Sequence, residues 1–393
     1  MRDRPEPARF LFTLLFFGLL ASYALLRGWQ ALAGHRSGQR ILAGTMILLF
    51  LSFPFTRLLV RSLPRFPRLV LGYLSNFYLA ALIYACHFIV LIDLLRLANA
   101  LFGIFPGFVA RNPHRSGLTA FWVVLAATAL ILMNGYMAAV RFRTRRVDLI
   151  LKPGNSSLPK LDIVLASDFH LSAFSRMDHL RKIASGINRL RSDLILLPGD
   201  ILDMNIPAKE KAEMISLLRS LRAPLGVFAV TGNHEISGGE EQNVANLAEA
   251  GIKVLEDEWI PVGGAFYLVG RRDMSIELMG LERKPLSRIL EGTKAGLPRI
   301  LMDHQPFHLE EAERSEIDLQ VSGHTHAGQI FPLTIVNKRM YERNWGYLRR
   351  GMTQYYVTCG VGTWGLPIRT GSKSEIVHLR ISFRNRSNSV TEI

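Results

Sequence analysis

An apolar run near the middle of the sequence ends in a carboxylate and an imidazole two residues apart. Residues 161–172 read LDIVLASDFHLS, and the polar pair is Asp168 and His170. Side chains at positions i and i+2 of an extended chain point to the same face, about 6–7 Å apart. Both side chains can therefore reach one cation. Because an Asp-x-His pair arises often by chance, the rest of the chain must decide whether this spacing is functional.

Four later apolar runs end in the same way, with Asp, Asn or His at the end of each expected strand. These residues are Asp200 with Asp203, Asn233 with His234, His304, and His324 with His326. In open α/β sheets the carboxyl ends of the strands form the binding crevice. Each piece alone has an ordinary explanation, because Gly-Asp forms turns and GNHE can begin a capped helix. Turns do not explain all five in one order, so we expect one shared site.

The donor types predict the chemistry of this site. Carboxylates, one carboxamide and imidazoles, without thiolates, suit Mn²⁺, Fe or Zn²⁺ in a catalytic rather than a structural site. A carboxylate that bridges two cations about 3.5–4 Å apart lets them act together on an in-line displacement at phosphorus. We therefore expect two divalent metal ions and the hydrolysis of a phosphate ester or pyrophosphate linkage.

The net charge of +15 is concentrated in the first part of the chain. Residues 1–150 carry 17 Arg, no Lys and four acidic residues, whereas residues 151–393 carry 30 basic and 28 acidic residues. A nucleic-acid enzyme concentrates basic charge on its folded domain, so this distribution argues against a nucleic-acid partner. Arginines between apolar runs are instead typical of membrane flanks. The two cysteines, Cys86 and Cys359, offer no disulfide framework.

Four apolar segments precede residue 141 and are long enough to be transmembrane helices. Their expected bounds are about 10–34, 41–60, 69–102 and 117–140. A helix needs about 20 apolar residues to cross the hydrocarbon core. Ten arginines flank one side of these spans and four flank the other. Because arginine-rich flanks stay in the cytoplasm, we expect both termini and the domain after Arg146 to be cytoplasmic.

Beyond Val147, short apolar strands alternate with helical patterns, which predicts an α/β domain. The expected strands are 161–167, 193–197, 225–230, 265–269, 276–280, 299–303, 319–322, 355–358 and 375–382, and the expected helices are 177–190, 208–222, 241–250, 285–295 and 307–313. A hairpin over residues 147–160 is expected to lead into the first of these strands. We therefore divide the chain into a membrane domain at 1–146, an α/β domain at 147–383 and a disordered tail at 384–393.

Five blocks, SDFH, GDILD, GNHE, DHQP and SGHTHAGQ, resemble the signature blocks of the calcineurin-like metallophosphoesterase superfamily. The resemblance covers about residues 161–383. With the N-terminal spans and the ending CGVGTWGLPIR, the chain further resembles the membrane-tethered bacterial branch. The resemblance implies a four-layer αββα sandwich, in which two mixed sheets pack together with helices outside. It also implies Mn²⁺ as the favoured metal and the bacterial inner membrane as the location.

The resemblance implies a role for each ligand. Asp168, His170 and His326 would hold one metal, Asn233, His304 and His324 would hold the other, and Asp200 would bridge both. His234 matches the family histidine that contacts the phosphate and protonates the leaving oxygen. Asp203 and Gln329 are expected to orient the ligands by hydrogen bonds without binding the metal themselves.

The substrate is the part that the sequence constrains least. The stretch NKRMYERNWGYLRRG follows the last ligand pair, and its basic residues are expected to meet a lipid phosphate or an anionic headgroup, unless it is a solvated loop. The candidate substrate contacts are Arg339, Arg343, Arg349, Arg350 and Arg369.

The predicted spans favour a lipid-linked phosphorylated substrate and contact with membrane lipids. Some relatives of the bacterial branch hydrolyse UDP-2,3-diacylglucosamine in lipid A synthesis, and this reaction is the leading expectation. The alternatives are another phospholipid phosphodiesterase or phosphatase, or a membrane sensor or transporter whose domain binds metal without catalysis. The sequence points to no particular protein partner.

Overall fold

The computed structural model describes residues 7–59, 62–152, 156–203, 206–294 and 296–383. The chain divides into two compact units, one of residues 1–136 with Gly365–Pro367 and one of residues 137–364 with 368–393. The expected disordered tail, 384–393, lies outside the described residues.

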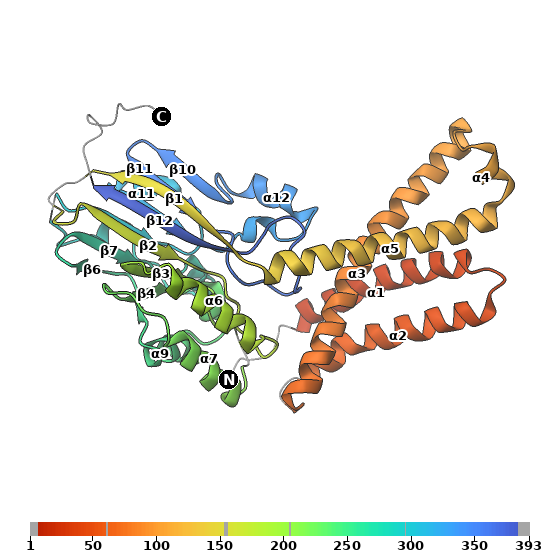
Figure 1. Ribbon diagram of the computed structural model, residues 1–393, viewed down its shortest axis with the longest axis horizontal. Coiled ribbons are helices and arrows are strands. Elements are labelled where there is room, and N and C mark those ends of the chain that lie inside the picture. The colour runs from red at the N-terminus through yellow and green to blue at the C-terminus, as the bar shows by residue number, and fades with distance from the viewer. Residues whose placement is uncertain (1–6, 60–61, 153–155, 204–205, 295, 384–393) are drawn as a thin grey trace. The chain divides into compact units, whose positions relative to one another are not determined.

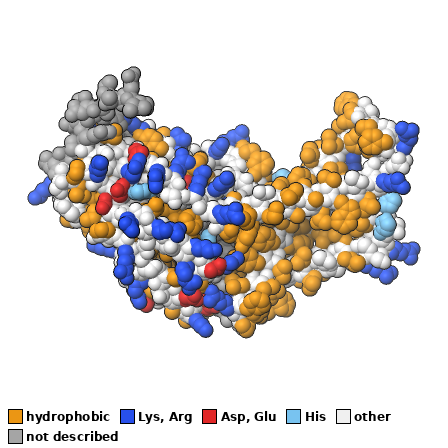
Figure 2. Space-filling model, viewed as in Figure 1, with side chains coloured by type: hydrophobic (Ala, Val, Ile, Leu, Met, Phe, Trp, Pro, Cys, Tyr) orange, Lys and Arg blue, Asp and Glu red, His pale blue; other side chains and the backbone are white. Residues whose placement is uncertain are grey.

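The first unit consists of helices (Figure 1). They are α1 (Pro7–Ala31), α2 (Arg36–Leu59), α3 (Arg65–Phe102) and the short α4 (Gly107–Arg111), followed by α5 (Pro113–Val140), whose last turn belongs to the second unit. Within the described residues, four helices are long and apolar enough to cross a membrane. Each begins a few residues before its predicted start, because the helix continues past the apolar stretch into polar flanks such as Arg36 and Arg65. Large apolar side chains cover much of the helical surface (Figure 2).

The second unit contains two six-stranded mixed sheets within the described residues. In the order β1-β12-β2-β3-β4-β5, the first sheet consists of β1 (Arg143–Leu151), β12 (Glu375–Phe383), β2 (Lys160–Leu165), β3 (Leu194–Pro198), β4 (Val227–Val230) and β5 (Lys253–Val254). In the order β10-β11-β9-β8-β7-β6, the second consists of β10 (Gly346–Arg350), β11 (Thr353–Val357), β9 (Leu319–Ser322), β8 (Arg299–Met302), β7 (Phe266–Gly270) and β6 (Glu258–Val262).

Helices connect many of the strands of the second unit. They are α6 (Met177–Arg189), α7 (Ala208–Leu218), α8 (Asn233–Ser237), α9 (Glu240–Glu249), α10 (Leu286–Ile289), α11 (Leu309–Arg314) and α12 (Leu333–Met340), with the 3-10 helices η1 (Met274–Met279) and η2 (His326–Gly328). Figure 1 shows α6, α7 and α9 along the side of the first sheet.

Three apolar cores define four layers. Alternate residues of β2 point to opposite faces, as a pleated strand requires. Ile163 and Leu165 join a core that contains residues of both sheets, whereas Val164 packs against α6 and α7 in a second core. A third core joins α10 and α11 to the outer face of the second sheet. The predicted αββα arrangement is therefore confirmed, and the buried strands explain the continuous apolar runs in the sequence.

The structure corrects three predictions of local structure. The hairpin expected over 147–160 includes residues 153–155, which lie outside the described ones, and the described strands β1 and β2 do not pair, because β12 lies between them and pairs parallel with β1. The strand expected over 276–280 is part of η1, where the Asp273 side chain caps Ser275 and Gly280 ends the turn with a left-handed backbone. The helix expected over 285–295 is only one turn long, from Leu286 to Ile289. Among the described residues, β5, β6, β10, α4, α8, α12 and η2 were not predicted.

Candidate metal centre

The predicted ligands follow the carboxyl ends of five strands. Strands β2, β3 and β4 run parallel in the first sheet, and β8 and β9 run parallel in the second. The residues that follow these strands gather into groups whose possible ligand atoms lie within 4.8 Å of one another. The groups are Asp168 with His170 and His326, Asp200 with His304 and His324, and His170 with Asp203 and His234.

Asp200 lies between two of these groups. Its Oδ2 atom is 3.3 Å from Nε2 of His304 and 3.7 Å from Nε2 of His170. Nε2 of His326 lies 2.9 Å from Nε2 of His170 and 3.6 Å from Oδ1 of Asp168. One carboxylate thus reaches both ligand groups, as a bridging ligand must.

Asn233 completes the second group. Its Oδ1 atom lies 2.8 Å from Nδ1 of His324. The structure therefore brings together all seven predicted metal ligands, and their assignment to individual ions stays a prediction.

The imidazole tautomers suit cation binding. Nδ1 of His304 lies 2.7 Å from the Pro198 carbonyl and donates its proton to it, which directs Nε2 toward the ligand cluster. This Nε2 atom is buried and has no hydrogen-bond partner among the described residues. Nδ1 of His170 lies 3.0 Å from Asp203, and this contact presents the opposite nitrogen to the ligand cluster in the same way. The donor set therefore fits divalent metal ions.

The ligands are held by an unusual backbone. Positive φ angles of 48–69° occur at five predicted ligands, namely Asp168, His170, Asp200, His324 and His326. Non-glycine residues in this region carry backbone strain, which concentrates at functional sites. Gly199 (φ 85°) and Gly232 allow the close approach, because a Cβ atom on Gly199 would lie 2.5 Å from Nδ1 of His304, and one on Gly232 would overlap Oδ1 of Asp200.

Opposite charges tune the buried ligands. Burial opposes ionisation of Asp200, but the charge of His304 outweighs it and holds the pKa of Asp200 well below its usual range. Burial lowers the pKa of His324 to about 4, and the charge of His304 adds to this effect. Asp200 is therefore ionised and His324 neutral at pH 7, which are the forms that bind metal.

Asp203 links one ligand to the predicted acid. Its Oδ1 atom lies 3.0 Å from Nδ1 of His170 and 2.8 Å from Nδ1 of His234. Burial opposes the protonation of His234, but the hydrogen bond with Asp203 and the charge of Asp200 raise its pKa to about 9. The side chains of Asp203 and His234 are each 22% exposed, whereas Asp168 and His304 are buried, so the cluster opens toward solvent on the His234 side.

Glu235 is a structural member of the site that sequence reasoning missed. Its buried carboxylate accepts hydrogen bonds from four backbone N–H groups, those of Asp200, Ile201, Leu202 and Gly232. It also forms the capping box of α8, so GNHE begins a capped helix and supplies ligands at the same time. The signal in the sequence was the glutamate three residues after Gly232.

Gln329 and Arg369 hold the loop that covers Asp168. The Gln329 amide forms two hydrogen bonds of 2.9 Å with the backbone of Trp364. Arg369, predicted as a substrate contact, is 1% exposed and donates to the carbonyls of Cys359 and Gly362. Its Nη2 atom also lies 3.1 Å from Nδ1 of His326. Arg369 therefore positions this loop and does not face a substrate.

The other predicted substrate arginines are dispersed. Arg350 is paired with Glu313 and Glu342. Arg349 and Arg350 end the antiparallel strand β10, so they lie toward the opposite end of the second sheet from the carboxyl end of β9. Arg339 is exposed on α12, and Arg343 is half-buried between α12 and β10. The carbonyl of Asn344, directly after Arg343, accepts a hydrogen bond from the Thr325 hydroxyl at 2.6 Å, so Arg343 lies near the ligand loop. The substrate roles of these arginines stay a prediction.

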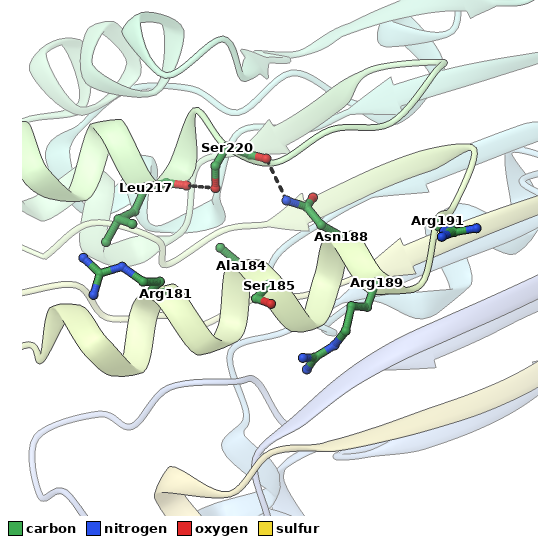
Figure 3. A pocket seen from close by; sticks show the side chains of 8 residues that line it. All are labelled: Arg181, Ala184, Ser185, Asn188, Arg189, Arg191, Leu217 and Ser220. Atoms are coloured by element: carbon green, nitrogen blue, oxygen red, sulfur yellow. Dashed lines mark hydrogen bonds between the residues drawn. The ribbon is translucent and has the colours of Figure 1, made fainter.

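A cavity of about 460 Å³ lies elsewhere, between α6 and α7. Arg181, Arg189 and Arg191 line it together with Asn188 and Ser220. Figure 3 shows the three guanidinium groups pointing in different directions, and Asn188 is already bonded to the Ser220 carbonyl. The lining includes none of the predicted ligands.

Comparison with known proteins places this geometry in a family. The calcineurin-like phosphoesterase family matches residues 161–328. An uncharacterized metallophosphoesterase of Helicobacter pylori is 34% identical over 231 residues, which cover 58% of this chain and 61% of the relative. One from Aquifex aeolicus is 31% identical over 230 residues, covering 57% of this chain and 87% of the relative.

Two further similarities extend the comparison. A transmembrane protein with metallophosphoesterase domain from Danio rerio is 31% identical over 274 residues, covering 65% of this chain and 61% of the relative. The solved NAD nucleotidase of Haemophilus influenzae aligns with 52% of this chain and 46% of its own at 14% identity and a TM-score of 0.35.

The chain belongs to the calcineurin-like phosphoesterase family, and its second unit is a metallophosphoesterase domain. The predicted superfamily and enzyme class are confirmed. The four apolar helices and the similarity to a transmembrane protein indicate a membrane protein. The chain spans 61% of the length of the Helicobacter pylori relative, so the activity of the whole protein is a matter of proposal.

Proposed function

We propose that this protein is a membrane-anchored phosphoesterase that uses two divalent cations to hydrolyse a phosphate ester or pyrophosphate linkage in a lipid-linked substrate. The observation that carries the proposal is the position of Asp200 within 3.3 Å of His304 and 3.7 Å of His170. This carboxylate joins two ligand groups in a domain whose first strand, β1, is separated by two residues from the candidate span that ends at Val140.

The protein's own groups divide the work of hydrolysis. Two divalent cations, when bound, act as Lewis acids that activate water and neutralise phosphoryl charge. Asp200 would hold both ions, and the imidazoles would bind through the ring nitrogens that their hydrogen bonds direct toward the cluster. Burial lowers the pKa of His234, but the hydrogen bond with Asp203 outweighs burial and raises this pKa to about 9. His234 is therefore protonated at pH 7. With Nδ1 directed to Asp203, its Nε2–H is available to protonate a leaving oxygen.

The membrane helices are the basis for the substrate class. A phosphoesterase domain two residues from a candidate span acts close to a membrane surface, and neither a soluble nucleotide nor a phosphoprotein requires that anchor. The Arg-rich flanks favour a cytoplasmic domain at a bacterial inner membrane. UDP-2,3-diacylglucosamine is the specific substrate proposed first, Mn²⁺ is the proposed metal, and Fe and Zn²⁺ also suit the donor set.

The experiment uses the full chain purified in detergent and freed of metal. Mn²⁺, Fe²⁺ and Zn²⁺ are added in turn, with bis-p-nitrophenyl phosphate as a general substrate and radiolabelled UDP-2,3-diacylglucosamine as the specific one. Release of UMP supports the specific proposal. Hydrolysis of the general substrate with phospholipid turnover, but without UMP, favours another phospholipid phosphodiesterase or phosphatase. Tight metal binding without turnover of any substrate favours the sensor.

A further inference from the structure

Helix α12 is one of the segments of the second unit that expose large apolar side chains, as residues 278–281 also do. Leu333, Val336 and Met340 are 54–58% exposed, and we call these three residues the α12 apolar face. Leu333, Val336 and Met340 are spaced at i, i+3 and i+7, so they share one side of the helix. Apolar side chains that cluster on one side of a surface helix mark an interaction surface.

The adjacent side of α12 is fixed to the metal-binding loop. The Asn337 side chain donates to the carbonyl of Thr325, between the two predicted ligands His324 and His326, at 3.2 Å. A Cβ atom on Gly328 would lie only 2.5 Å from Cα of Thr334, so the helix packs directly on this loop. Helix α12 is therefore held against this loop while its apolar face stays exposed.

Contacts within the second unit also connect α12 to the last turn of α5. Gly371 packs against the Thr334 side chain. Three residues later, Ser374 donates from its backbone to the Ala138 carbonyl at 3.2 Å and from its hydroxyl to the Ala139 carbonyl at 2.8 Å. Three residues span at most about 11 Å. Helix α12 thus lies near the point where the candidate span Pro113–Val140 ends.

We propose that the α12 apolar face binds the lipid bilayer that α5 enters. A bilayer accepts aliphatic side chains at the level of the acyl chains, and Lys338 and Arg339, both exposed on α12, complement the phosphates of anionic headgroups. Long basic side chains can reach the headgroups while their stems lie among apolar neighbours. The helix is then an interfacial contact that holds the His324–His326 loop at the membrane surface.

This contact bears on the proposed function, because it would bring lipid phosphates close to the metal centre. Only this effect on the substrate rests on the proposed function. Tyr341, directly after α12, has its ring centroid 6.2 Å from that of His324. A lipid whose headgroup lies beside α12 would therefore have its phosphate close to a predicted metal ligand. The binding of the bilayer itself requires neither metal nor substrate.

The test uses full-length protein in nanodiscs and measures whether a labelled residue lies in contact with the lipid acyl chains. Val336→Cys is labelled with bimane, and quenching by phosphatidylcholine brominated on its acyl chains is measured with about 20% phosphatidylglycerol present, so that the bilayer carries anionic headgroups. Leu125→Cys, which is exposed on α5, is the lipid-facing control, and Glu241→Cys, which is exposed on α9, is the solvent-facing control. Protein without an introduced cysteine measures background from the buried Cys86 and Cys359.

The proposal predicts a loss of intensity of about twofold or more at position 336, comparable with position 125, and little loss at position 241. An unquenched label at position 336 beside a quenched label at position 125 would overturn it. A disulfide that links two copies of Val336→Cys through the introduced thiols, without quenching, would also overturn it and would assign the surface to a second copy. Because no substrate is present, these results do not depend on whether the proposed hydrolysis is observed.

Discussion

The Nδ1 atom of His234 lies 2.8 Å from Oδ1 of Asp203. The same oxygen lies 3.0 Å from Nδ1 of His170, so one carboxylate orients both a predicted ligand and the predicted acid. Burial would raise the pKa of Asp203, but its hydrogen bonds with the two histidines lower it to about 2. Asp203 is therefore ionised across the physiological range and can hold both rings in place.

Replacing this carboxylate by an amide tests its positioning role. Asp203→Asn keeps the size but removes the charge, and we expect about a 10–100-fold loss of metal affinity or kcat. Metal content after dialysis and the rate with bis-p-nitrophenyl phosphate measure the two effects. Asp178→Asn, which changes an exposed carboxylate paired with Arg176, is the matched control. Equal values for the two variants would contradict the role of Asp203.

The protonated form of His234 predicts a dependence on the leaving group. We expect His234→Gln to lose about 10²–10⁴-fold in kcat with alkyl phosphate esters, whose leaving oxygen needs a proton. The loss should be much smaller with p-nitrophenyl esters, because p-nitrophenolate leaves without protonation. A series of esters with leaving groups of different pKa measures this difference. The same loss across the whole series would show that His234 does not act as the acid.

The hydrogen bonds of Glu235 predict a stability effect. Glu235→Gln replaces an acceptor by an amide whose NH₂ group would face backbone N–H donors, including that of Ile201, where Oε1 now accepts at 2.6 Å. An unsatisfied buried donor costs about 1–3 kcal/mol. We expect a lower thermal midpoint in detergent, with metal-dependent activity lost at a lower temperature. Glu241→Gln on the exposed side of α9 is the control, and equal midpoints would count against this account.

The buried thiol of Cys359 predicts a pH dependence of alkylation. Burial raises its pKa to about 12, and the charge of Glu375 adds to the shift. The raised pKa favours the neutral thiol, so the stabilisation it reflects is present below the unfolded pKa of about 8.5 and is lost as the pH rises toward 12. Native Cys359 should resist iodoacetamide at pH 8–9 and react after denaturation. Mass spectrometry of the peptide measures this, and native labelling with a midpoint near 8.5, as for a free thiol, would contradict it.

The sequence predicted the ligand cluster because each ligand can be recognised from the few residues around it. Each ligand follows a short apolar strand, and parallel strands place their carboxyl ends at one edge of a sheet. Long-range pairing left no such signal, which is why β12 between β1 and β2 was missed. The short apolar run over 276–280 fits a strand as well as a turn, and the Asp273 cap decided the outcome.

Arg369 and α12 show a second limit. A conspicuous arginine next to a glycine-rich loop reads as a substrate contact, but only the folded chain shows that its donors are taken by backbone carbonyls. The stretch that begins at Asn337 was interpreted from its charges as a contact for lipid phosphates, unless it is a solvated loop. The aliphatic residues at helical spacing, Leu333 and Val336 before this stretch and Met340 within it, were the overlooked signal.

The central claim is that Asp200 joins two metal sites that act together in hydrolysis. The most direct measurement is a titration of metal-free full-length protein with Mn²⁺, in which bound metal and hydrolysis of bis-p-nitrophenyl phosphate are followed together, for the wild type and for Asp200→Asn. We predict that wild-type activity rises only as the second equivalent binds, and that Asp200→Asn loses activity by about 10²-fold or more, the scale of losing a group that stabilises the transition state. Full activity with one equivalent, or wild-type turnover by Asp200→Asn, would contradict the claim.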